Sequence, residues 1–190
     1  MVINYLGDGC FRLQSGELSV LVNPANHRLK ADVVLRTLTL ANVAPPPDEI
    51  IFPGEYEVKG IEIQGYPLAA ESTDKFIKTV YLVRWEEMQF LFLGHISKPL
   101  PAELIEEFEP DVLFLPTGDD HFLAPADAAK LVRQLEPAVT MPGYYKEYNS
   151  FAKAFGQKAE VEEKFVFRKK DLDPEKSRLL VLEAKDNNSK

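Results

Sequence analysis

The sequence predicts an α/β (α+β) fold in which two mixed β-sheets are flanked by helices. Strand-like segments fill the first half of the chain, whereas helix-like segments alternate with strands in the second half, and this order is typical of the class. The chain has 190 residues, of which 45% are hydrophobic and 27% charged, which suits one domain with a large core. We expect that single domain over residues 1–184 and a flexible polar tail over residues 185–190.

The strands of the first half are predicted from short runs of β-branched and aromatic residues between turn residues. The expected turns are Asp8-Gly9, Ser15-Gly16 and Glu86-Glu87. Ala44–Pro47 is expected to be an extended loop, because proline lacks the backbone donor that a helix or an inner strand needs. The predicted strands are Val2–Leu6, Cys10–Gln14, Leu18–Val22, Val33–Leu35, Ile50–Phe52, Tyr56–Val58, Ile61–Tyr66, Thr79–Trp85 and Met88–Gly94.

In the second half of the chain, the sequence pattern predicts helices between short buried strands. Pro125–Leu135 carries Ala128, Leu131, Val132 and Leu135 on one face, the pattern of an amphipathic helix. The other predicted helices are Pro101–Phe108, which begins with proline, and Tyr148–Phe155, which is followed by Gly156. The predicted strands are Val112–Leu115, Val139–Met141, Ala159–Val161, Phe165–Phe167 and Leu179–Leu182.

Charge and cysteine content exclude several classes of function. The net charge of −8 opposes binding to nucleic acid and gives no attraction to an anionic membrane. The single cysteine, Cys10, excludes an internal disulfide and a cysteine-based zinc cluster. Without a signal peptide or an apolar run near 18 residues, a cytoplasmic location is expected. The only histidines are His27, His95 and His121, fewer than an imidazole-rich dinuclear zinc site normally needs.

The order and spacing of several segments resemble the metallo-β-lactamase fold. They include INYLGDGCFRL (Ile3–Leu13), PGEYEVKGI (Pro53–Ile61), FLFLGHISKPL (Phe90–Leu100) and DVLFLPTG (Asp111–Gly118). The chain is most similar to the small single-domain branch described as zinc-dependent hydrolases. This resemblance implies a four-layer αββα sandwich. In that family an H-x-H-x-D-H motif and further histidines and aspartates hold one or two Zn²⁺ ions, which activate a bound water.

The positions that would carry the metal ligands hold other residues in this chain. The four positions of the motif fall at Leu38, Leu40, Asn42 and Val43, and leucine and valine cannot coordinate a metal. The later strand-end aspartate falls at His95 and the late histidine at Tyr144. Three further positions fall at Asp8, Asn23 and Lys98.

These replacements predict a protein without a metal cofactor and without a catalytic residue. Leu38 and Leu40 are expected to fill the former cavity with apolar volume. Since the scaffold is otherwise intact, we expect a pseudoenzyme that acts by binding or assembly, with a protein partner or a second copy of itself.

Two alternatives stay open. In the first, the chain is a metal-dependent hydrolase whose rebuilt site uses His95, Asp119, Asp120 and His121 around one divalent ion, Zn²⁺ or Mn²⁺. In the second, the chain is a small-molecule sensor that uses the remnant pocket. The candidate residues of that pocket are Asp8, Asn23, His95, Lys98, Asp119, Asp120, His121 and Tyr144. The simplest interpretation of His95 and Tyr144 is that they pack and hydrogen-bond locally.

Overall fold

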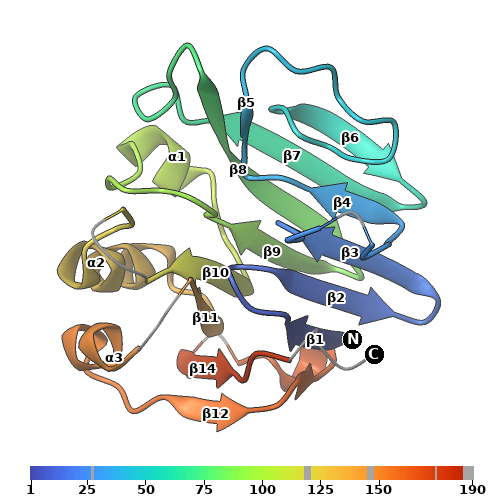
Figure 1. The fold of residues 1–190 in the computed structure, drawn as a ribbon. Coiled ribbons are helices and arrows are strands. Elements are labelled where there is room, and N and C mark those ends of the chain that lie inside the picture. The colour runs from blue at the N-terminus through green and yellow to red at the C-terminus, as the bar shows by residue number, and fades with distance from the viewer. Residues whose placement is uncertain (27, 118–120, 145–147, 174, 186–190) are drawn as a thin grey trace.

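The computed structural model describes residues 1–26, 28–117, 121–144, 148–173 and 175–185 (Figure 1). Its two β-sheets are both mixed. The smaller sheet has the strand order β13-β1-β2-β3-β4, in which only the β3–β4 pair is parallel. Its strands are β1 (Val2–Tyr5), β2 (Phe11–Ser15), β3 (Leu18–Val22), β4 (Val33–Leu35) and β13 (Phe165–Val166).

The larger sheet has the order β12-β14-β11-β10-β9-β8-β7-β6, with β5 paired to one end of β8. Its first half is parallel and its second half is antiparallel. Its strands are β5 (Leu38–Leu40), β6 (Gly54–Val58), β7 (Ile61–Pro67), β8 (Phe76–Trp85), β9 (Met88–Phe92), β10 (Val112–Pro116), β11 (Val139–Gly143), β12 (Glu160–Glu162) and β14 (Arg178–Leu182).

The two sheets face each other across one hydrophobic core. Aromatic side chains from both sheets join there: Phe11 of β2 meets Phe114 of β10 edge-on, with 4.7 Å between ring centroids. Phe92 of β9 stacks on Phe114 at 4.2 Å. Because this core is contiguous, the strand ends of one sheet are held in a fixed place relative to the other.

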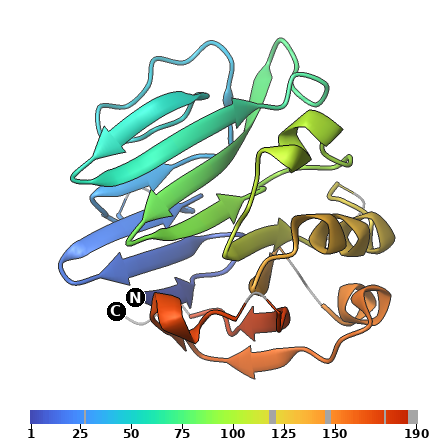
Figure 2. The same cartoon turned by 180° about the vertical axis from the view of Figure 1, so that it is seen from behind.

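A second core lies between the outer face of the larger sheet and the helices (Figure 2). The helices are α1 (Ala102–Glu106), α2 (Pro125–Leu135) and α3 (Asn149–Phe155), followed by the short 3₁₀ helix η1 (Lys169–Asp171). Helix α2 buries the apolar face expected from its sequence. None of the helices in the described ranges has the length and apolar character needed to span a bilayer.

The predicted fold class and pair of mixed sheets are confirmed, and most predicted elements are present. One strand differs. Ile50–Phe52 forms no strand, and Ile50 makes only an isolated parallel bridge to Leu35 of β4. The hairpin turn at Glu86-Glu87 is confirmed, with both residues at positive φ. Helices α1, α2 and α3 all lie on the side of the larger sheet, while Leu29 and Ala31 cover part of the outer face of the smaller one.

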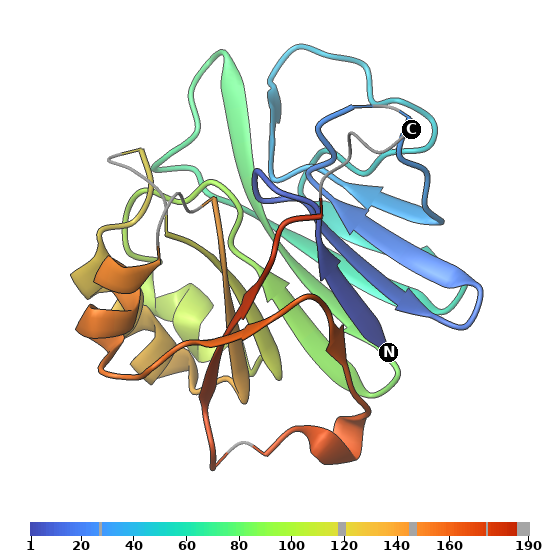
Figure 3. The ribbon, with the colours of Figure 1, turned by 60° about the horizontal axis from the view of Figure 1, so that its bottom comes forward.

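The carboxyl ends of five parallel-paired strands meet at one end of the sandwich (Figure 3). They belong to β3 and β4 of the smaller sheet and to β9, β10 and β11 of the larger one. In mixed α and β folds this is where binding and catalytic groups gather. The residues that follow β3, β4, β9 and β11 therefore form the candidate site.

Candidate functional site

Four side chains from four strand ends form one hydrogen-bonded network. Asn23, after β3, donates from Nδ2 to Thr37 Oγ1 and to the Tyr144 hydroxyl, each at 2.9 Å. The Asn23 Oδ1 accepts from the Thr37 backbone N–H at 2.9 Å. Thr37 Oγ1 lies 2.8 Å from Nδ1 of His95, which follows β9. These bonds join strand ends of both sheets, so the network links the two sheets.

The Tyr144 ring occupies the space where these strand ends converge. It stacks on Phe122 at 4.7 Å and contacts His95 at 4.8 Å between ring centroids. It also lies directly over Gly9, where an added Cβ would come within 2.0 Å of the ring. Beside the tyrosine, the remaining cavity between Phe11, Asn23, Phe92, Phe114 and Gly143 holds only about 10 Å³. The mouth of the two sheets is therefore filled, with room for about one water molecule.

Backbone groups hold Tyr144 in this position. Its φ is 57°, in the left-handed region that nonglycine residues seldom adopt. Its N–H donates to the Tyr5 hydroxyl at 3.2 Å, and the same hydroxyl accepts from the N–H of Gly9 at 3.2 Å. Backbone strain of this kind persists only where neighbouring groups fix the conformation. The fold therefore holds the Tyr144 ring in this one position.

The environment of His95 favours the neutral imidazole. Burial, followed by the positive charge of Lys78, lowers the pKa of His95 to about 4. A neutral ring offers one nitrogen as an acceptor, so Nδ1 can accept the proton of the Thr37 hydroxyl. Burial also raises the pKa of the Tyr144 hydroxyl well above its usual value. The site therefore contains a neutral phenol, a neutral imidazole, an amide and an alcohol at neutral pH.

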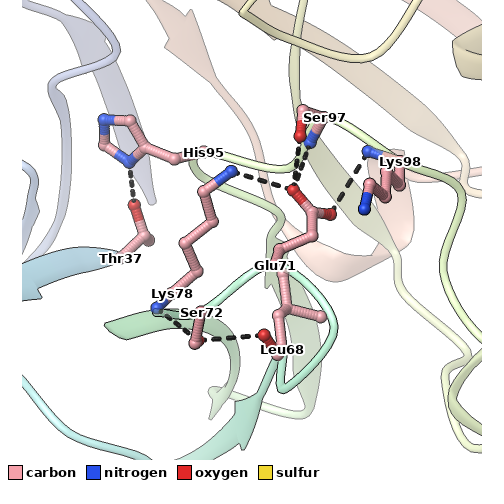
Figure 4. A network of polar contacts seen from close by, with 8 residues as sticks. All are labelled: Thr37, Leu68, Glu71, Ser72, Lys78, His95, Ser97 and Lys98. Carbon is pink, nitrogen blue, oxygen red and sulfur yellow. Dashed lines mark hydrogen bonds and ion pairs between the residues drawn. The ribbon is translucent and has the colours of Figure 1, made fainter. Parts of the chain in front are cut away.

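A buried carboxylate fixes the segment that follows His95. Glu71, with only 5% of its side chain exposed, pairs with Lys78 at 2.8 Å. Its carboxylate also accepts the N–H and the hydroxyl of Ser97, at 2.8 and 2.6 Å, and the N–H of Lys98 at 3.2 Å. In Figure 4 the Lys78 side chain runs between the Thr37–His95 pair and Glu71. This ion pair holds a positive charge beside the imidazole.

Because the pKa of His95 is lowered, we expect the folded protein to lose stability in mild acid. Its pKa in the folded protein, about 4, is below the ordinary value of 6.5 that applies when the chain is unfolded. The unfolded state therefore binds the proton first, and stability falls as the pH drops from about 6.5 to 4, by up to about 3 kcal/mol. Urea unfolding between pH 7.5 and 4 should show a steeper loss for the wild type than for His95→Asn. Parallel curves would contradict the assignment.

The structure brings together three of the predicted pocket residues, Asn23, His95 and Tyr144. Asp8 is an exposed turn residue at positive φ, and His121 is exposed. Lys98 is exposed and joins the Glu71 network through its backbone N–H. Asp119 and Asp120 lie outside the described residues.

The four positions matched to the ligand motif do not line the small cavity beside Tyr144. Leu38 and Leu40 belong to β5, and the Leu40 side chain is 54% exposed. Asn42 and Val43 are exposed as well. These leucines do not line the remaining cavity between the strand ends. The ring over Gly9 at the mouth belongs to Tyr144, whereas Leu38 and Leu40 lie on β5, which pairs with β8.

Sequence reasoning missed several residues of the site. Thr37 is fully buried at the centre of the network, and Tyr5, Phe122 and Glu71 support it. Thr37 could have been identified from the sequence, because it is a polar residue that closely follows the buried strand Val33–Leu35. Nothing in the local sequence marks Glu71, whose partners follow it by 7 and 26 residues.

Comparisons with known proteins agree with the fold. The family model described as "Beta-lactamase superfamily domain" matches residues 2–143. The UPF0173 metal-dependent hydrolase MK1542 of Methanopyrus kandleri is 30% identical over 109 residues, which is 52% of this chain and 46% of that protein. The chain thus matches about half the length of this curated relative.

Solved structures show the same fold. One described as a Zn-dependent hydrolase of the metallo-beta-lactamase superfamily, from Thermotoga maritima, has a TM-score of 0.78 at 23% identity, covering 95% of this chain and 97% of that one. The metallo-beta-lactamase fold protein YhfI of Bacillus subtilis has a TM-score of 0.68 at 8% identity, covering 96% of each chain.

These comparisons correct the prediction that no metal cofactor is involved. MK1542 and the Thermotoga protein are described as metal-dependent and Zn-dependent hydrolases, which points to a divalent metal. The donors at the strand ends do not fit such an ion. Among the residues that the structure describes, no three His, Cys, Asp or Glu side chains are grouped to hold a metal, whereas a zinc site normally uses three or four such ligands.

Proposed function

Since the chain belongs to the beta-lactamase superfamily, we propose that it is a pseudoenzyme of that family, which acts by binding or assembly. In this proposal the strand-end network is a structural closure and not a hydrolytic site.

One observation carries the proposal: Tyr144 fills the mouth of the two sheets. Ligand pockets usually have about 300–1,000 Å³, whereas the space left beside Tyr144 is about 10 Å³. A substrate could reach the strand ends only if the Tyr144 ring left Gly9 and Phe122 and broke its bond to Asn23. The same filling argues against a sensor whose ligand occupies the remnant pocket.

The chemistry of the side chains supports the same conclusion. The Thr37 hydroxyl is completely buried and already bonded to Asn23 and His95, so it is not available as a nucleophile. His95 uses Nδ1 within the network. The rebuilt hydrolytic site receives no support from the described geometry, in which His121 is exposed and belongs to no metal-binding group with His95.

An activity panel tests this proposal. The purified protein, supplied with Zn²⁺ or Mn²⁺, is assayed on a phosphodiester, a lactone, a thioester and a β-lactam. We expect no turnover above that of metal and buffer alone. Turnover that disappears in both His95→Ala and His121→Ala, with each variant still folded by circular dichroism, would overturn the proposal in favour of the rebuilt hydrolase.

The proposal includes a cytosolic setting and a protein as the bound partner. The lone cysteine, Cys10, is buried and free, and burial raises the pKa of its thiol to about 11. Such a thiol is unreactive and suits a reducing compartment. With the strand ends closed, the outer surface of the fold is the place where a partner would bind.

A further inference from the structure

Strand β5 forms an open edge of the larger sheet. It pairs with β8 on one side, with Leu38 opposite Lys78, Thr39 opposite Ile77 and Leu40 opposite Phe76. Across the described residues, no strand or loop is paired to its other side. Figure 1 shows β5 beside the upper end of β8. A free edge of this kind presents unpaired backbone groups to any strand that approaches.

The backbone groups on this edge can be assigned from the bonds to β8. The Thr79 N–H donates to the Thr37 carbonyl at 2.9 Å, and the Ala41 N–H donates to the Lys75 carbonyl at 2.8 Å. In an antiparallel ladder alternate residues face the partner strand, so residues 37, 39 and 41 face β8. The N–H and C=O groups of Leu38 and Leu40 therefore point outward, to the open side.

The side chains around this edge are apolar and exposed. Leu40 is 54% exposed and Phe76, its cross-strand neighbour, is 45% exposed. Val43, which follows β5, is 38% exposed. These three are among the five large hydrophobic side chains recorded as exposed in the described chain. An apolar cluster on a free strand edge is typical of an interaction surface.

The edge also lacks charge, unlike the two end strands of the larger sheet. From Thr37 to Pro47 the sequence contains no ionisable side chain, although the chain has a net charge of −8. At the two ends of the larger sheet, β6 carries Glu55 and Glu57 and β12 carries Glu160 and Glu162. Charges on an edge strand prevent pairing with another chain, and β5 has no such protection.

We propose that β5 is a homodimer interface, in which it pairs antiparallel with β5 of a second copy about a two-fold axis at Thr39. In this register Leu38 of one copy faces Leu40 of the other, and the outward groups of both form about four backbone hydrogen bonds. The two Phe76 side chains flank the pair.

A second copy is the partner that suits this edge best. The register is self-complementary, as a two-fold interface requires. Two acidic molecules with a net charge of −8 each repel one another at most surfaces, and the uncharged segment from Thr37 to Pro47 is one along which they can approach. The inference rests on the proposed binding role and names the surface and partner for it.

Mass measurement tests the dimer. Sedimentation velocity over a range of protein concentrations should show an equilibrium between 21.5 kDa and twice that mass. Leu40→Lys should shift it fully to monomer. The matched control is Val166→Lys, since Val166 is 62% exposed on strand β13 and should leave the dimer unchanged. Leu40→Pro should also give monomer, because it removes an N–H that the folded chain does not use.

Crosslinking tests the register. Two Thr39 residues at the axis would form a non-hydrogen-bonded pair with Cα atoms about 4.5 Å apart, within the range of a disulfide. Mild oxidation should therefore link Thr39→Cys into a dimer and leave Val166→Cys monomeric. A protein that is monomeric at every concentration, or a dimer insensitive to Leu40→Lys, would overturn the proposal. Neither result would affect the expected absence of turnover.

Discussion

Gly94→Ala is expected to lower the free energy of unfolding by about 3 kcal/mol or more. Gly94 follows β9 with φ +59°, and a Cβ added there would lie 2.2 Å from Cβ and Oγ1 of Thr37. The left-handed conformation costs an alanine about 1–2 kcal/mol, and overpacking a closed core costs about 1–3 kcal/mol more. Thr37 is fully buried and bonded to Asn23 and His95, so it cannot move aside cheaply. Urea unfolding at neutral pH measures the loss.

Gly16→Ala separates the two parts of this cost. Gly16 lies in the β2–β3 turn with φ +56°, and nothing lies within 4 Å of an added Cβ. Its replacement should cost only the backbone part, about 1–2 kcal/mol. If Gly94→Ala were no more destabilising than Gly16→Ala, the close approach of Thr37 to Gly94 would be wrong.

Tyr144→Ala is expected to destabilise the protein by about 3 kcal/mol, the low end of the usual cost of truncating a large aromatic residue, because Tyr144 is partly exposed. The change removes the stacking on Phe122 and the contact with His95, and leaves Asn23 Nδ2 with Thr37 as its remaining recorded partner. Tyr144→Phe keeps the ring and loses only the hydroxyl, so it should cost about 1 kcal/mol. Thermal or urea unfolding of the two variants beside the wild type gives both values.

A double-mutant cycle with Gly9→Ala tests whether the Tyr144 ring lies over Gly9. In the wild type the added methyl group meets the Tyr144 ring, because its nearest ring atom would be 2.0 Å away. In the Tyr144→Ala background that clash is absent. There Gly9→Ala should lower the free energy of unfolding only by the cost of its positive φ of 71°. Strictly additive free energies would show that the two residues do not touch.

The closed site could be predicted only in part. Asn23, His95 and Tyr144 were identified as pocket residues because the resemblance to the metallo-β-lactamase fold places them at strand ends. The sequence predicts that Leu38 and Leu40 fill the cavity, whereas both lie on β5 and neither lines the cavity. The sequence shows that those leucines are apolar. It does not show which sheet their strand joins. That depends on contacts between residues 40 positions apart, such as Leu38 and Lys78.

By itself, the sequence determined the class of fold and the order of most strands and helices. Local patterns of apolar residues, turns and proline specify these features, since each depends on neighbours along the chain. Only the tertiary structure decided that a tyrosine closes the mouth of the sheets, that Thr37 joins four strand ends, and that β5 leaves an uncharged edge open. These depend on which strand ends and edges meet in space, and short-range patterns do not encode such contacts.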